Sequence, residues 1–174
     1  MFNVPTVTVA KVTLDSGASS VTLDYAAPAG VSWTPRHLYV RANGSASVAI
    51  NVDIQLNGDT GNNYNSQRLK AYTNSTNGGR TTDDDSFFVG VFPTTADVAG
   101  SFEVLFPDAL STRSYKSGLS FTGSGDGNQL NTHGLRWENT AAITSVEIIN
   151  NVSATFEAGS TFELCVVDES FNID

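Results

Sequence analysis

Residues 137–167 read WENTAAITSVEIINNVSATFEAGSTFELCVV, and this stretch decides the fold. Alternate residues share one face in both of its halves: Thr144, Val146 and Ile148 in the first, and Phe162, Leu164 and Val166 in the second. Because successive side chains of a strand point to opposite faces, the alternation predicts two half-buried β-strands. The EAGS segment at 157–160 supplies turn residues before the second strand, which is expected to close the core.

The strongest single strand is predicted at residues 48–56. One row is expected to be buried and consists of Val48, Ile50, Val52, Ile54 and Leu56. The opposite row, Asn51, Asp53 and Gln55, is expected to be more exposed or to lie at an interface. Residues 74–86, NSTNGGRTTDDDS, contain few apolar side chains and are predicted to form a mobile surface loop.

The rest of the chain predicts an all-β protein. About ten short apolar runs are separated by turn signals, and none of them has the 3.6-residue period of a helix. Residues 6–14 and 20–25 are expected to form a hairpin. The pattern favours a two-sheet antiparallel β-sandwich, with a single domain at 6–174 and an N-terminal arm at 1–5.

Two segments carry a family resemblance. The patterns W-x-N-T-A-A-I-T-S-V at 137–146 and F-x-A-G-S-T-F-x-L at 156–164 resemble the C-terminal signature of small tailed-phage virion proteins with a jelly-roll fold. The segment VDIQLNGDTGNNYNSQRL at 52–69 is similar to a strand, loop and following strand of the same family.

The resemblance implies jelly-roll topology and a structural role on a bacteriophage virion. The expected function is a capsid decoration or cement protein, bound as a homotrimer to the major capsid protein at capsomer junctions. Its expected location is the outer surface of the capsid, after assembly in the host cytoplasm.

Charge and composition exclude several classes of partner. Nine basic and 18 acidic residues give a net charge of −9, which argues against binding to nucleic acid or to an anionic membrane. No apolar run is long enough for a transmembrane helix, and the first residues do not resemble a signal peptide. Cys165 is the only cysteine, so no intrachain disulfide can form, and it is expected to be a small buried residue.

No catalytic, metal or cofactor site is expected. The loop at 57–62 and the acidic run at 83–85 offer oxygen atoms, but neither has the acid spacing of a calcium loop. His37 and His133 have no metal-ligand spacing with each other or with Cys165. There is no nucleophile elbow and no recognisable pair of catalytic carboxylates, so the chain is not expected to be an enzyme.

Five apolar residues are candidates for contacts with a partner: Phe2, Val4, Phe87, Phe88 and Phe92. The first two lie on the arm, outside any alternating pattern, and the other three lie in a strand more apolar than one half-buried face requires. The alternative function is a tail-fibre or receptor-binding domain that recognises host carbohydrate through an aromatic shelf flanked by Asn and Asp. A polysaccharide-degrading enzyme is the third hypothesis.

Overall fold

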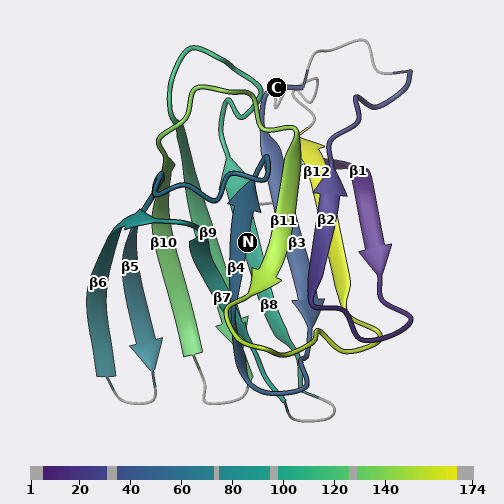
Figure 1. The fold of residues 1–174 in the computed structure, drawn as a ribbon, viewed down its shortest axis with the longest axis vertical. Coiled ribbons are helices and arrows are strands. Elements are labelled where there is room, and N and C mark those ends of the chain that lie inside the picture. Colours follow the sequence, from purple (N-terminus) through teal and green to yellow (C-terminus); the bar gives the residue numbers. More distant parts are fainter. Residues whose placement is uncertain (1–5, 31–34, 73–74, 95–97, 126–128, 168–174) are drawn as a thin grey trace, which may run out of the picture.

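Alternating apolar residues build two antiparallel β-sheets that face each other across one core (Figure 1). The computed structural model describes residues 6–30, 35–72, 75–94, 98–125 and 129–167. The larger sheet has eight strands in the order β1-β12-β3-β8-β9-β10-β5-β6, and the smaller has four in the order β2-β11-β4-β7. The strands are β1 (Thr6–Thr13), β2 (Ser20–Asp24), β3 (Leu38–Gly44), β4 (Ile50–Leu56), β5 (Tyr64–Tyr72), β6 (Ser75–Asp84), β7 (Phe87–Phe92), β8 (Gly100–Phe106), β9 (Lys116–Ser124), β10 (Gln129–Trp137), β11 (Ser145–Asn150) and β12 (Thr161–Val167).

The strand order is that of a jelly roll with two inserted hairpins. Without β5, β6, β9 and β10, eight strands remain. Numbered 1 to 8 in chain order, they form one sheet of order 1-8-3-6 and another of order 2-7-4-5. Two Greek keys produce this arrangement, so the predicted sandwich class and jelly-roll topology are both confirmed. The four inserted strands extend the larger sheet beyond β8: β9 still packs against β7, and β10, β5 and β6 reach past the edge of the smaller sheet (Figure 1). We call these four strands the wing.

The inward rows of both sheets meet in an apolar core. Ile50, Val52, Ile54 and Leu56 of β4 are at most 2% exposed, and the predicted inward row of β12 is completely buried. The rings of Phe92 and Phe162, from opposite sheets, lie 6.2 Å apart between centroids. Burial of such a side chain contributes about 1.5–3 kcal/mol. No helix that could cross a membrane occurs in the part of the chain that the structure describes.

The prediction for Val48 was wrong, because β4 begins two residues later and Val48 is 49% exposed. Residues 45–49 carry the chain from one sheet to the other. Backbone hydrogen bonds hold this crossing, from the Ala46 amide to the Pro93 carbonyl and from the Ser47 amide to the Thr155 carbonyl, both at 2.9 Å. Val48 therefore lies in the crossing segment and not in the strand, so its side chain does not join the inward row of β4.

Asp53 and Gln55 lie on the expected face of β4, but they are buried rather than exposed. The turn between β6 and β7 covers this face, and the Gln55 side-chain amide donates a hydrogen bond to the Asp85 carbonyl at 3.1 Å. Asn51, nearer the start of the strand, is exposed as predicted. An inserted hairpin that folds back over a sheet therefore reversed the burial expected from alternation.

Two local predictions also need correction. Most of the region predicted as a mobile loop is the edge strand β6, which pairs with β5 from Tyr72–Ser75 to Tyr64–Asp84. Its side chains are nearly all exposed, so the sequence has no alternation to reveal it. The predicted hairpin between β1 and β2 is absent, because β1 pairs with β12 in one sheet and β2 pairs with β11 in the other.

The loop before β5 is held by one carboxylate. Asn57 and Gly58 both have positive φ angles, of 56° and 65°, and the Asp59 amide donates to the Leu56 carbonyl at 3.0 Å, which makes a tight turn. The Asp59 side chain then accepts hydrogen bonds from the Gly61 amide at 2.9 Å and from the buried Trp137 indole at 2.8 Å. This loop is thus bound to the last residue of β10.

The same loop is bound to the segment before β11. The Asn57 side-chain oxygen accepts hydrogen bonds from the Thr144 amide at 2.7 Å and the Ser145 amide at 3.1 Å, and its amide nitrogen donates to the Ala142 carbonyl at 2.8 Å. A backbone bond from Glu138 to Asn63, at 2.8 Å, lies beside them. The two segments that carry the family resemblance are therefore neighbours, and they meet where the wing joins the jelly roll.

Replacement of Asp59 by Ala is predicted to lower the free energy of unfolding by about 1–3 kcal/mol, because the buried Trp137 indole loses its acceptor. Denaturant titration followed by tryptophan fluorescence measures this change. Asp15→Ala, in an exposed turn, is the matched control and is expected to change stability by less than about 0.5 kcal/mol. Equal losses in the two variants would show that the Asp59 contacts do not stabilise the fold.

Candidate functional site

The wing has two faces of different chemistry, because successive side chains on its strands alternate between them. On the outer face, which points away from the smaller sheet, four large apolar side chains are 41–59% exposed: Leu69, Leu119, Phe121 and Leu130. Thr132 of β10 pairs with both Phe121 of β9 and Leu69 of β5, so these residues lie across adjacent strands. We call this set the outer patch.

The other half of the same outer face is charged. Glu163 of β12 forms ion pairs with Lys11 of β1, at 2.8 Å, and with Arg41 of β3. Such partly exposed pairs add little to stability, but they keep that half of the sheet polar. The apolar surface is thus confined to the inserted strands and is not a general property of the sheet.

The inner face of the wing borders a polar cleft of about 390 Å³. We call it the wing cleft. Arg68 of β5 and His133 of β10 line it on the wing side, and Asp53 of β4 and Phe88 of β7 line it on the side of the smaller sheet. Asp84, the last residue of β6, and Asp85, in the connection to β7, also line it.

A bulge in β7 places Phe88 in the wing cleft. The pairing of β4 with β7 shifts between Val52 and Asp53, so that Val52 pairs with Gly90 and Asp53 with Phe88. Bulges of this kind redirect a side chain at the edge of a sheet. The Phe88 ring makes a T-shaped contact with His133 at 5.2 Å, and the Arg68 guanidinium lies over the same ring at 5.7 Å.

Burial shifts the pKa values of two groups in the cleft. Burial, with the nearby charges of Asp84 and Asp85, raises the pKa of Asp53 to about 7. Burial and the Arg68 charge lower the pKa of His133 to about 4, so this imidazole is neutral at pH 7. Both ring nitrogens of His133 and the Arg68 Nε are buried without a hydrogen-bond partner among the described residues. Buried polar atoms without partners are rare in folded proteins, and they mark places where water or a ligand binds.

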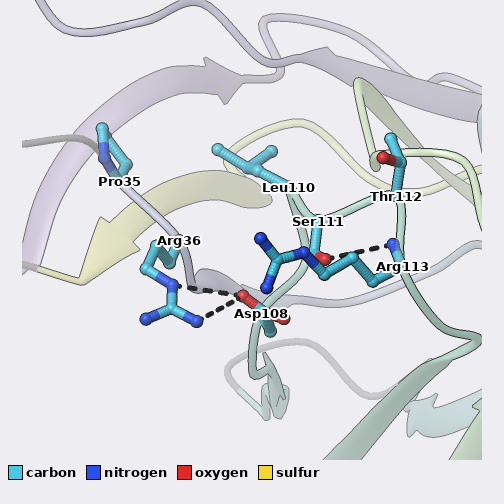
Figure 2. A pocket seen from close by; sticks show the side chains of 7 residues that line it. All are labelled: Pro35, Arg36, Asp108, Leu110, Ser111, Thr112 and Arg113. Atoms are coloured by element: carbon cyan, nitrogen blue, oxygen red, sulfur yellow. Dashed lines mark hydrogen bonds and ion pairs between the residues drawn. The ribbon is translucent and has the colours of Figure 1, made fainter.

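A second cavity, of about 540 Å³, lies among loops and is called the loop pocket here. Figure 2 shows that Arg36 reaches across to Asp108, which accepts hydrogen bonds from its Nη2 at 2.9 Å and its Nε at 3.2 Å. The Asp108 amide also donates to the Nδ1 of His37 at 2.7 Å. Because Arg36 and Asp108 bind each other, the loop pocket offers less free hydrogen-bonding capacity than the wing cleft.

The predicted partner-binding residues lie in different places. Phe87 and Phe92 are 1% and 0% exposed in the chain's own core, so neither has free surface for a partner. The bulge accounts for the apolar sequence, since it lets Phe92 be buried as well as Phe87 and Val89, whereas unbroken alternation would bury only the last two. Phe88 lines the wing cleft, and its role in binding a partner stays a prediction. Phe2 and Val4 lie outside the described residues.

The residues considered for other chemistry are also located. Cys165 is fully buried, as predicted. The Asn57 and Asp59 side chains are used in hydrogen bonds within the chain, as the turn interpretation requires. No group of three or more His, Cys, Asp or Glu side chains that could hold a metal ion occurs within the described ranges.

Sequence reasoning missed both faces of the wing. Leu119 and Phe121 alternate as a strand should, but the inward row of β9 is the polar one and includes Ser120 and Thr122. Small polar residues on a strand do not indicate burial, so the sequence carried no usable signal for the orientation of β9.

Comparisons with known proteins show no family for this chain. No protein-family model matches it, and no curated protein sequence does. Among solved structures, alginate lyase Aly36B is similar to it with 6% sequence identity and a TM-score of 0.31, over 91% of this chain and 79% of that one. A likeness this distant carries no argument about activity.

The stability of the protein is predicted to fall between about pH 4 and pH 8 through Asp53. Its pKa is raised from 3.8 to about 7 by folding, so in this interval the folded state holds a proton that the unfolded chain has lost. The contribution is present in full below pH 3.8 and is lost as the pH rises through about 7. Asp53→Asn does not titrate, so its melting temperature should rise relative to wild type as the pH rises.

Thermal melts of both proteins at several pH values measure the difference. Asp24→Asn, which replaces an exposed carboxyl on β2, is the control. Parallel curves for wild type and Asp53→Asn would contradict the assignment of a buried carboxyl to this position.

Proposed function

We propose that this chain is a structural protein of a tailed-phage virion that decorates the outer surface of the capsid as a homotrimer. The outer patch is the observation that carries the proposal, because it is a surface suited to contact with another protein. The resemblance of residues 52–69 and 137–164 to virion proteins supports the choice of assembly. The structure adds that these segments meet in one hydrogen-bonded junction.

The outer patch supports protein association for a physical reason. Large contiguous apolar areas are uncommon on monomeric proteins, and they mark sites of interaction. Leu69, Leu119, Phe121 and Leu130 gather on neighbouring strands, and the sheet beneath them is firmly paired on both sides of β10. An apolar surface carried by hydrogen-bonded strands can be buried between subunits with little ordering of the backbone.

The charge of the chain supports an external position. With a net charge of −9, the protein is repelled by the negatively charged nucleic acid inside a capsid. The ion pairs around Glu163 keep the opposite half of the large sheet's outer face polar, which is compatible with contact with water. The contact with a partner is therefore assigned to the wing.

The alternative function is recognition of host carbohydrate by a receptor-binding domain. The wing cleft supports it, because Phe88 lines the cleft together with Asn51 and Asp53. An aromatic ring between amides and carboxylates is the arrangement expected for that function, whereas the outer patch favours assembly. A polysaccharide-degrading activity draws no support from the described residues.

The oligomeric state tests the role of the outer patch. Purified wild-type protein at micromolar concentration is expected to have the mass of three 18.4 kDa chains, roughly 55 kDa, by light scattering. The double variant Leu119→Ser, Phe121→Ser removes two large exposed side chains from the patch and is expected to be monomeric, with its stability unchanged or improved.

The matched control is Val48→Ser, Val152→Ser, which removes two apolar side chains of similar exposure, 49% and 50%, outside the wing. It should remain a trimer. A monomeric wild-type protein, or a control that dissociates as completely as the patch variant, would contradict the assignment of the interface to the outer patch.

A further inference from the structure

The wing cleft is a feature that the proposed function does not use. Its volume of about 390 Å³ falls in the range of about 300–1,000 Å³ that is usual for small-molecule sites. It is built from elements far apart in sequence, since Asp53 lies on β4, Phe88 on β7 and His133 on β10. The hairpin insertions bring these side chains together, and a jelly roll without a wing would have no such cleft.

The charges in the cleft nearly cancel. Asp84 and Asp85 carry negative charge and Asp53 is partly protonated near pH 7, while Arg68 and Arg80 supply two positive charges. A strongly anionic ligand would meet the carboxylates, and a strongly cationic ligand would meet the guanidinium groups. The lining therefore favours a neutral ligand.

The hydrogen-bonding groups favour a ligand with hydroxyl groups. Carboxylates only accept hydrogen bonds, guanidinium groups only donate them, and a neutral imidazole does both. A hydroxyl group also does both, so neighbouring hydroxyls on one ring can satisfy this mixed lining. Phe88 adds an apolar surface, suited to the C–H face of a sugar ring.

Two side chains in the cleft have buried nitrogen atoms with unused hydrogen-bonding capacity. The Nε of Arg68 and both nitrogens of His133 have no partner among the residues that the structure describes. His133 is 1% exposed, so its nitrogens are not compensated by bulk solvent. A ligand hydroxyl that reaches these atoms, directly or through a bound water molecule, removes that deficit.

We propose that the wing cleft is a binding site for a neutral saccharide, with Arg68 and Asp84 as its principal hydrogen-bonding residues and Phe88 as its apolar wall. This inference goes beyond the proposed assembly function and does not depend on it; it gives the alternative function, carbohydrate recognition, a defined site and a ligand class. A decoration protein that exposes this cleft would give the particle a weak affinity for glycans.

Nuclear magnetic resonance titration of the full-length protein tests the proposal. The probes are the methyl glycosides of glucose, galactose, mannose and N-acetylglucosamine, with glucuronate and glucosamine as charged comparators. At least one neutral glycoside is expected to cause saturable shifts of backbone amides around the cleft at millimolar concentration. Both charged comparators are expected to bind more weakly than that glycoside.

Two substitutions locate the binding. Arg68→Gln and Asp84→Asn each remove a charged hydrogen-bonding group, and each is expected to raise the Kd of the bound glycoside about tenfold or more. Arg113→Gln makes the same kind of change in the loop pocket and is expected to leave the Kd unchanged. Thermal melts of all three variants confirm that each is folded before the Kd values are compared.

Three results would overturn the proposal. The first is the absence of saturable shifts at the cleft with every neutral glycoside. The second is tighter binding of glucuronate or glucosamine, which would indicate an ion site instead. The third is a folded Arg68→Gln or Asp84→Asn variant whose Kd equals that of wild type. None of these results bears on the oligomeric state, so the two proposals fail separately.

Discussion

The hydrogen bond between the buried Trp137 indole and the Asp59 carboxylate is the contact on which the arrangement of the wing depends. The chain first enters the wing through the loop after β4 and leaves it for the last time through the segment before β11, and between β6 and β9 it returns to the jelly roll as β7 and β8. Asp59 binds the end of β10, and Asn57 binds residues 142–145, so both connections are joined at one place. Partial burial opposes ionisation of Asp59, but hydrogen bonds from Gly61, Trp137 and Asn63 outweigh it and hold the pKa of this carboxyl below its ordinary value. The junction is therefore stable at neutral pH.

The position of the wing explains how one small protein can offer two kinds of surface. A jelly roll uses the inner faces of its sheets for the core, and the inserted strands extend one sheet beyond the region that the other covers (Figure 1). The inserted strands have an apolar row on the outer face and a largely polar row on the inner face. The outer row suits a flat protein contact, and the inner row, beside the edge of β7, forms a cleft. Both functional proposals thus follow from the same insertion.

The sequence predicted the fold where one face of a strand is core and the other is solvent. That condition holds for β12, for β4 from Ile50 onward and for Val146 and Ile148 of β11, and it explains why these inward residues were predicted correctly. The prediction for Thr144 was wrong, because β11 begins at Ser145 and Thr144 lies exposed before it. It fails for β6, an edge strand with no buried face, and for β9, whose inward row is polar. It fails for Asp53 and Gln55 because a turn distant in sequence covers them. The wing and its cleft depend on such long-range contacts, so alternation along the chain could not reveal them.

Cryo-electron microscopy of the virion to which we propose to assign this chain tests the central claim most directly, because it would show both faces of the wing in place. The account predicts a trimer on the outer surface of the capsid, with Leu119 and Phe121 buried in a protein contact and the wing cleft open to solvent. A particle in which the outer patch faces solvent, or in which the chain occupies no capsid position, would contradict it.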